Sequence, residues 1–293
     1  MLCHFFSKRT ILVNLLKKAS MKKSFIISLY ILSTGFLIQS FGQTHALKPA
    51  IKLIMPLTAE DIMPGTRGAS VVWHPVQKKY YAAMAGNKDY PLAVFDAKGK
   101  RISKDSLKCM QDVRGLWYNP DVRIIQGNTY NDDGWFSYIL DAKGYPAGSQ
   151  SVFAGQLQPG LQSIGAYDFK KKTVLFVHEG RLYSYYIKDG IIISDVEINW
   201  GLTKSSSPDD LAVSETDDYN STTVIYTGIK DAEIGFLNNY KRQIELYDLA
   251  TCHLAKTLTL PDDAKAETTF NFAYTNGIYW LFDMEGRTWH GYK

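Results

Sequence analysis

A strand–turn–strand segment recurs along this chain, and no other feature constrains the fold as strongly. The clearest copy is LAVFDAKGKR at residues 92–101, where an apolar run meets a polar turn and a second short run. Related segments follow at residues 137–145, 184–191, 244–251 and 279–287. Asp96 and Asp141 mark the same turn about 45 residues apart, and a period of this length indicates a propeller or another repeat array.

Each copy belongs to a larger unit of short strands with almost no helical periodicity. Four strands are expected in each of the first four units, at residues 68–74, 79–85, 92–96 and 100–103; 113–118, 122–126, 135–140 and from 145; 163–169, 173–178, 181–187 and 191–196; and 210–215, 222–229, 242–249 and 256–260. The fifth unit has only three, at 270–275, 278–282 and 288–292. The aromatic content of 13% also favours strands.

The missing strand of the fifth unit has a candidate elsewhere in the chain. Residues 51–57 (IKLIMPL) form an apolar strand with no hairpin partner nearby. Because a ring leaves no open sheet ends, we expect this strand to complete the last unit. The sequence therefore predicts an all-β protein, a β-propeller of five four-stranded blades, as one domain over residues 51–293. Residues 43–50 are expected to be a linker, and residues 200–218 a loop, which argues against a sixth blade.

The repeats resemble the broad superfamily of secreted bacterial propellers of the WD-repeat and related kind, over about residues 50–293. The likeness is one of architecture, since the Gly-His and Trp-Asp dipeptides of WD blades are absent from the sequence. It implies a rigid radial scaffold. Propellers serve both as binding modules and as enzymes, so the resemblance leaves the activity open.

The first 42 residues have the features of a leader. Met21-Lys22-Lys23 precedes the apolar run 24–41, which is typical of a secretory signal, and Met21 is a candidate for the true start. Cleavage is expected after Gly42, with Ala46 as the alternative. We therefore expect a secreted or periplasmic protein with no stable membrane span; the alternative is an uncleaved N-terminal helix that tethers it to a membrane.

Removing this leader changes the charge balance of the chain. Residues 1–42 hold six Lys and Arg and no acid, which leaves 27 basic against 29 acidic side chains. The net charge then becomes about −2 instead of +4, so the basic pI belongs to the leader and nucleic acid is not expected as a partner.

Cofactor and metal motifs are missing from the sequence. It contains no phosphate-binding, dinucleotide-binding or Cys-x-x-Cys pattern, so no cofactor is expected. The turn residues Asp96, Asp141 and Asp283 are expected to accept hydrogen bonds from their own turns instead of holding a metal. Cys109 and Cys252 are expected to be unpaired, partly buried thiols, with one long-range disulfide as the alternative.

Aromatic residues are the strongest candidates for a binding surface. Trp73, Trp117, Tyr167 and Tyr274 fall near the ends of the first strands of four units. If these ends share one side of the ring, the aromatic rings would form a face that binds a protein or a carbohydrate. The alternative is that the rings pack between blades. A monomeric, non-catalytic binding or scaffold protein is thus the first expectation.

An enzyme is the second expectation. His74 and His178 end the first and second strands of their units, and Asp168 and Glu179 lie nearby in the sequence. If these four side chains met at the mouth of the central channel, they could serve a hydrolase, a lyase or a cyclase. Their convergence in one pocket is the condition on which this alternative depends.

Overall fold

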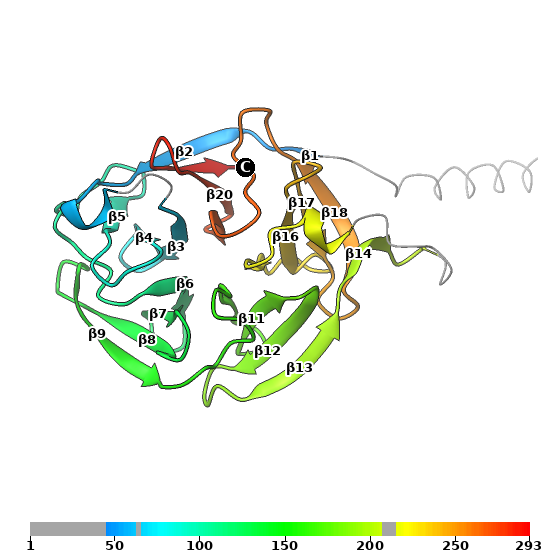
Figure 1. Ribbon diagram of the computed structural model, residues 1–293, viewed down its shortest axis with the longest axis horizontal. Coiled ribbons are helices and arrows are strands. Elements are labelled where there is room, and N and C mark those ends of the chain that lie inside the picture. Colours follow the sequence, from blue (N-terminus) through cyan, green and yellow to red (C-terminus); the bar gives the residue numbers. More distant parts are fainter. Residues whose placement is uncertain (1–44, 63–65, 207–214) are drawn as a thin grey trace, which may run out of the picture. The chain divides into compact units, whose positions relative to one another are not determined.

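Five β-sheet blades are arranged in a ring around a central axis (Figure 1). The structure is a computed structural model, and it describes residues 45–62, 66–206 and 215–293. The predicted leader, residues 1–42, and the cleavage site after Gly42 lie outside these residues. The prediction of a five-bladed β-propeller is confirmed.

Blades 2 and 3 run in chain order from the centre outwards, as four antiparallel strands each. Blade 2 consists of β6 (Val113–Asn119), β7 (Ile124–Thr129), β8 (Trp135–Leu140) and β9 (Pro146–Phe153). Blade 3 consists of β10 (Ala166–Asp168), β11 (Thr173–His178), β12 (Arg181–Tyr186) and β13 (Ile192–Glu197). The strands of both blades lie close to their predicted positions.

Blade 1 has three full strands, β3 (Gly68–His74), β4 (Lys79–Met84) and β5 (Leu92–Asp96). The fourth strand expected at residues 100–103 is reduced to a single bridge between Phe95 and Arg101. The Ser103 hydroxyl and the Ile102 amide bond the Val94 backbone in place of a longer ladder. The outer edge of this blade is therefore closed by a loop.

Blade 4 differs most from its prediction. Its strands are β15 (Ile225–Tyr226), β16 (Ile234–Asn238), β17 (Gln243–Tyr247) and β18 (His253–Thr259). The strand β16 is fully buried, yet no strand was predicted there. The strand expected at residues 210–215 lies outside the described residues except for Glu215, which is not in a strand.

Two further strands pair in parallel with the outer strand of blade 4. They are β1 (His45–Ala46) and β14 (Asn199–Thr203). The first shows that the expected linker 43–50 contains strand residues, and the second corrects the expected loop at residues 200–218. Both run along an outer edge and are largely exposed or half-buried, so they lack the apolar alternation from which strands are predicted.

Blade 5 closes the ring with both ends of the propeller, as predicted. Its strands β19 (Phe272–Thr275), β20 (Ile278–Asp283) and β21 (Thr288–Tyr292) are followed by β2 (Pro49–Ile54) as the outermost strand. The strand β2 covers residues 49–54 instead of the predicted 51–57. Beyond it the short 3₁₀ helix Ala59–Asp61 carries the buried Asp61, which pairs with Arg287.

The hydrophobic core is divided into five clusters, one between each pair of neighbouring blades. Between blades 1 and 2, for example, Val72 and Tyr81 pack with Leu116 and Phe136. Each blade is covered on both faces, so its strands are apolar at successive positions; β4 has five buried residues in a row. The shared packing holds the blades in fixed positions around the axis.

The turn acids act as predicted. The Asp96 carboxylate accepts hydrogen bonds from the backbone N–H groups of Lys98 and Lys100, at 2.8 and 3.0 Å. Asp141 accepts from Lys143 and Tyr145 in the same way, each at 2.8 Å. Asp283 also accepts one backbone N–H within its turn. These bonds fix the hairpins of blades 1, 2 and 5.

Cys109 and Cys252 are both free and buried, so the prediction of two unpaired thiols is confirmed. Burial raises the pKa of Cys109 to about 12. Within the part of the chain that the structure describes, no helix is long and apolar enough to cross a membrane.

Candidate functional site

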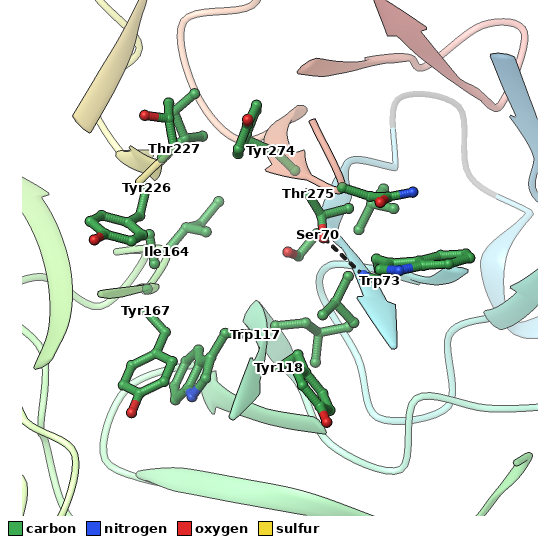
Figure 2. Close-up of a pocket in the computed structure, with 18 of the residues that line it drawn as sticks. Ser70, Trp73, Trp117, Tyr118, Ile164, Tyr167, Tyr226, Thr227, Tyr274 and Thr275 are labelled. Atoms are coloured by element: carbon green, nitrogen blue, oxygen red, sulfur yellow. Dashed lines mark hydrogen bonds between the residues drawn. The ribbon is translucent and has the colours of Figure 1, made fainter. Parts of the chain in front are cut away.

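A cavity of about 320 Å³ lies at the centre of the ring (Figure 2). All five blades contribute to its wall, each through its innermost strand or the residues next to it. The contributing segments are Ser70–Trp73, Leu116–Tyr118, Ile164–Tyr167, Thr223–Thr227 and Phe272–Gly277. The cavity thus lies where the inner strands end and turn back into the second strands.

The inner strands approach one another closely toward their other ends. A Cβ atom on Gly115 would lie only 2.6 Å from the Gly165 backbone nitrogen, so no side chain fits there. Ile164 forms a bridge with Thr223, and the Gly68 N–H donates to the Asn271 side chain at 2.8 Å. These contacts narrow the channel on that side, so we take the wider end, at the turns, as the mouth of the cavity.

The lining of this cavity is uncharged. Among the described residues that line it there is no carboxylate, imidazole, amine, guanidinium or thiol. Its polar groups are hydroxyls, amides and backbone atoms. The Ser70 hydroxyl points into the cavity in Figure 2 and has no hydrogen-bond partner among the described residues. A site of this kind can stack on and hydrogen-bond a neutral group, but it offers nothing to neutralise a charge.

The four aromatic residues singled out from the sequence all line this cavity. Trp73 and Tyr274 are half-buried at its mouth. The Trp73 ring packs on Tyr80, with ring centres 4.5 Å apart, and its backbone N–H donates to the Thr275 hydroxyl at 3.0 Å. The Tyr274 ring lies 4.8 Å from that of Tyr279.

Trp117 and Tyr167 lie deeper, between blades 2 and 3. They are only 4% and 6% exposed and belong to the cluster that joins these blades. Figure 2 shows both rings leading away from the middle of the cavity, side by side. Neither the Trp117 indole N–H nor the Tyr167 hydroxyl has a hydrogen-bond partner among the described residues. Burial raises the pKa of Tyr167 to about 12, so the hydroxyl is neutral at physiological pH.

Several lining residues were not among the candidates from the sequence. Tyr118 and Tyr226 extend the aromatic wall, while Ser70 and Thr275 supply hydroxyls. Tyr118 directly follows the candidate Trp117, so a signal for it was present. Ser70 and Thr275 sit within strand patterns in which a small hydroxyl residue has no distinguishing mark.

His74 lies outside the central cavity. It is 3% exposed, and its ring packs on that of Tyr118 at 4.7 Å. The His74 Nδ1 atom accepts a hydrogen bond from the Gln77 backbone N–H at 3.3 Å. Burial lowers the pKa of His74, while a hydrogen bond with the Arg123 backbone raises it. The imidazole is therefore neutral and joins the turns of blades 1 and 2.

The other three residues of the enzyme alternative lie in blade 3, at two different places. Asp168 is 1% exposed at the end of β10, where its carboxylate accepts the backbone N–H groups of Lys170 and Lys171. His178 and Glu179 are brought together at the end of β11, with Nε2 and Oε1 3.6 Å apart. Since β11 runs antiparallel to β10, the His178–Glu179 pair lies at the opposite end of blade 3 from Asp168, and so on the opposite face of the ring.

Among the described residues no three His, Cys, Asp or Glu side chains are grouped as metal ligands. Asn220, which begins the glycosylation-type sequence Asn-Ser-Thr, is 1% exposed. Its amide donates to the Glu267 and Phe270 carbonyls, so the folded chain uses it as an internal bridge.

No protein-family model and no curated protein matches this chain. Among solved structures, the glutaminyl cyclase of Myxococcus xanthus is similar, with a TM-score of 0.53 and 8% identity, over 85% of this chain and 97% of that one. The Cps50 (Swd1) β-propeller domain of Myceliophteria thermophila gives a TM-score of 0.41 at 10% identity, over 78% and 97%. A chain of a nidogen/laminin complex gives 0.40 at 12%, over 66% and 63%. The first likeness supports the propeller fold and, at this identity, the fold alone.

Proposed function

We propose that this chain is a non-catalytic binding protein whose central cavity receives an uncharged, partly apolar group of a protein or carbohydrate partner. One observation carries the proposal. All five blades contribute to a cavity whose lining combines half-buried aromatic rings with hydroxyl and amide groups and carries no charged side chain. Its volume of about 320 Å³ falls within the range of sites for small ligands and single side chains.

The chemistry of the lining supports binding over catalysis. General acid–base catalysis needs a titratable group within hydrogen-bond reach of the reacting atom. In the central cavity the only side chains of that kind are tyrosines, and burial raises the pKa of Tyr167 and of Tyr274. Similarity to a glutaminyl cyclase at 8% identity concerns the fold, so a cyclase activity is not carried over.

The proposal includes action outside the cytoplasm. Its support is the basic start Met21-Lys22-Lys23 and the apolar run 24–41, which together are typical of an export signal. Cleavage after Gly42 would leave both β1 and β2 intact, whereas cleavage after Ala46 would remove β1. We therefore favour Gly42 as the cleavage site and a secreted or periplasmic monomer as the mature form.

A cavity-filling substitution tests the site. The protein, produced from the full sequence, is screened against a glycan array and a dodecapeptide display library, and the binders are titrated by tryptophan fluorescence. Ser70→Leu places a larger side chain in the central cavity and is expected to weaken binding at least tenfold. The matched control Ser184→Leu fills a separate cavity between blades 3 and 4 and is expected to leave binding unchanged.

Binding by Ser70→Leu decides whether the central cavity is the site. Loss of binding in Ser70→Leu, with circular dichroism and Tm close to those of Ser184→Leu, supports the central cavity as the site. Equal binding by Ser70→Leu and the parent protein would overturn the proposal.

A further inference from the structure

A second cavity, of about 530 Å³, lies between blades 1 and 2. We call it the blade 1–2 groove. Blade 1 contributes the turn residues His74, Val76 and Gln77. Blade 2 contributes the turn residues Arg123 and Ile124, the segment Ser137–Asp141, and Gln150.

The groove lies where two strands of blade 2 separate. The ladder between β7 and β8 covers three residue pairs and ends at Gln126–Ser137, although β7 begins at Ile124 and β8 continues to Leu140. In blade 1 the equivalent ladder between β4 and β5 covers five pairs and reaches the turn at Lys79–Asp96. Blade 2 therefore has strand segments that carry no β7–β8 pair among the described residues, at Ile124–Ile125 and at Tyr138–Leu140. Ile125 and Tyr138 are buried, whereas Ile124, Ile139 and Leu140 are half-buried or exposed and line the groove.

Two additional residues account for the separation. In blade 1, Val94 in the third strand precedes the turn residue Asp96 by two positions, whereas in blade 2 the equivalent Ser137 precedes Asp141 by four. The longer β8–β9 hairpin leans on blade 1, where the Tyr81 hydroxyl donates to the Gly144 carbonyl at 2.6 Å. The hairpin is thus held away from β7 by contacts to the neighbouring blade.

A buried polar group without a partner lines the groove. Ser137 is 1% exposed, and its hydroxyl has no hydrogen bond among the described residues. A buried hydroxyl without a partner destabilises the fold unless something pairs with it. Its position beside the free strand edges suits a ligand that brings backbone donors and acceptors.

The walls and the charges of the groove also suit a peptide ligand. Val76 and Ile139 are 63% and 50% exposed and lie beside the cavity, so both can contact a ligand that enters it. Arg123 and Asp141 carry opposite charges, and neither forms an ion pair among the described residues. The groove therefore combines apolar walls with the Arg123 guanidinium and with the Asp141 carboxylate, one oxygen of which accepts the N–H groups of its own turn.

The groove and the central cavity share a wall. In the segment Trp73–Val76, the residues Trp73 and Pro75 line the central cavity, and His74 and Val76 line the groove. Both open at the side of the ring where the first and third strands of the blades end. A ligand that enters the central cavity and continues outwards between blades 1 and 2 would meet the groove next.

We propose that the blade 1–2 groove binds an extended peptide segment of the partner, which runs along the strand edges that line the groove, at Ile124 and Ile139–Leu140. The peptide backbone bonds these edges and the Ser137 hydroxyl, and an apolar side chain packs on Val76 and Ile139. Charged side chains of the peptide meet Arg123 and Asp141. This mode is β-strand addition, in which the backbone supplies affinity and side-chain pockets supply specificity. The inference rests on the proposed function and names the partner as a polypeptide.

The test compares two exposed isoleucines. Dodecapeptides are selected on the protein produced from its full sequence and are titrated by fluorescence anisotropy against Ile139→Gln and the control Ile193→Gln, which lies on β13 of blade 3. Ile139→Gln is expected to weaken binding about tenfold, because it removes an apolar contact of the peptide. Ile193→Gln is expected to change nothing. Both positions are exposed, so both variants are expected to fold.

Ser70→Leu, measured on the same peptides, separates this inference from the proposed function. Peptides weakened by Ile139→Gln and by Ser70→Leu support both. Peptides weakened by Ser70→Leu alone overturn the groove and leave the central cavity as the site. Peptides weakened by Ile139→Gln alone support the groove and overturn the central cavity. A protein that selects glycans and no peptides overturns the inference.

Discussion

Blades 1 and 2 carry the same turn sequence, DAKG, yet a groove opens beside this turn in blade 2 while the equivalent ladder of blade 1 stays closed. The turns themselves are alike, since Asp96 and Asp141 each accept two backbone N–H groups. The difference lies in the strand before the turn, where Val94 precedes Asp96 by two positions and the equivalent Ser137 precedes Asp141 by four. A repeated turn therefore specifies a hairpin, whereas the register leading into it decides whether the neighbouring strands stay paired.

The interiors of the two blades also differ. At the second strand, blade 1 has Ala83 where blade 2 has Asn128, and both are fully buried. The Asn128 amide donates to the Gln158 side chain and to the Ser163 carbonyl, and its oxygen accepts the Gly165 N–H at 3.0 Å. Blade 2 is thus tied to blade 3 by a polar network at a position where blade 1 is packed with apolar groups.

The largest effect is expected from Asn128→Ala, which makes blade 2 resemble blade 1 at this position. Three hydrogen bonds are lost and buried partners are left unpaired, so the free energy of unfolding should fall by about 3 kcal/mol. Thermal denaturation should show a Tm lower by about 10 °C. The control Asn239→Ala removes a side-chain oxygen that has no partner among the described residues and should change the Tm little. Equal Tm values for the two variants would contradict the importance of the network.

Substitution of the turn acids should lower the stability less than Asn128→Ala does, and by the same amount in blades 1 and 2. Asp96→Ala and Asp141→Ala each remove two hydrogen bonds to backbone N–H groups, so each should lower the free energy of unfolding by about 1 kcal/mol, measured by urea titration. Asp141→Ala should also weaken peptide binding, because Asp141 lines the groove and Asp96 does not. Weakened binding in both variants would show that the effect comes from general loosening.

Of blades 1 and 2, acidification should act on blade 1 through His74. Burial lowers the pKa of His74, and the equivalent residue of blade 2, Asn119, does not titrate. The unfolded state then binds more protons than the folded state, so stability falls as the pH drops below the ordinary histidine pKa of about 6.5.

His74→Asn should reduce the slope of stability against pH between about pH 7 and 5, measured by urea denaturation at a series of pH values. It should not abolish the slope, because burial also lowers the pKa of His290. An unchanged slope in His74→Asn would mean that the unfolded and folded proteins protonate this residue alike.

The smallest effect on stability is expected from Ser137→Ala. Because the Ser137 hydroxyl has no partner among the described residues, its removal should leave the Tm unchanged or raise it slightly. The same variant should weaken peptide binding about fivefold, which is the loss of one net hydrogen bond. A clear fall in Tm would show that the hydroxyl has a structural partner after all.

The sequence carried enough information for the ring and its closure. The recurring turn acids located the hairpins, and the unpaired apolar strand near residue 51 identified the outermost strand of blade 5. Strand β16 was missed because the polar segment Lys230–Glu233 precedes a short apolar run containing Gly235. Propensity alone does not distinguish such a run from a loop.

The candidate site was predictable in part. The positions of Trp73, Trp117, Tyr167 and Tyr274 placed them around one cavity, but whether a ring faces the cavity or a neighbouring blade depends on packing between residues far apart in the chain. The groove could not be predicted from the sequence. Blades 1 and 2 share the same turn sequence about 45 residues apart, so the two additional residues in the strand before the second turn do not stand out.

Because blade 5 joins strands from the two ends of the propeller, its closure determines when the ring can form during synthesis and folding. Strand β2 is synthesised early and β21 much later, and the Asp61–Arg287 pair that covers their junction joins residues 226 positions apart. The ring therefore cannot close before β21 has been synthesised. Until then the apolar faces of blade 5 lack their last partner, so ring closure is a late, long-range step of folding.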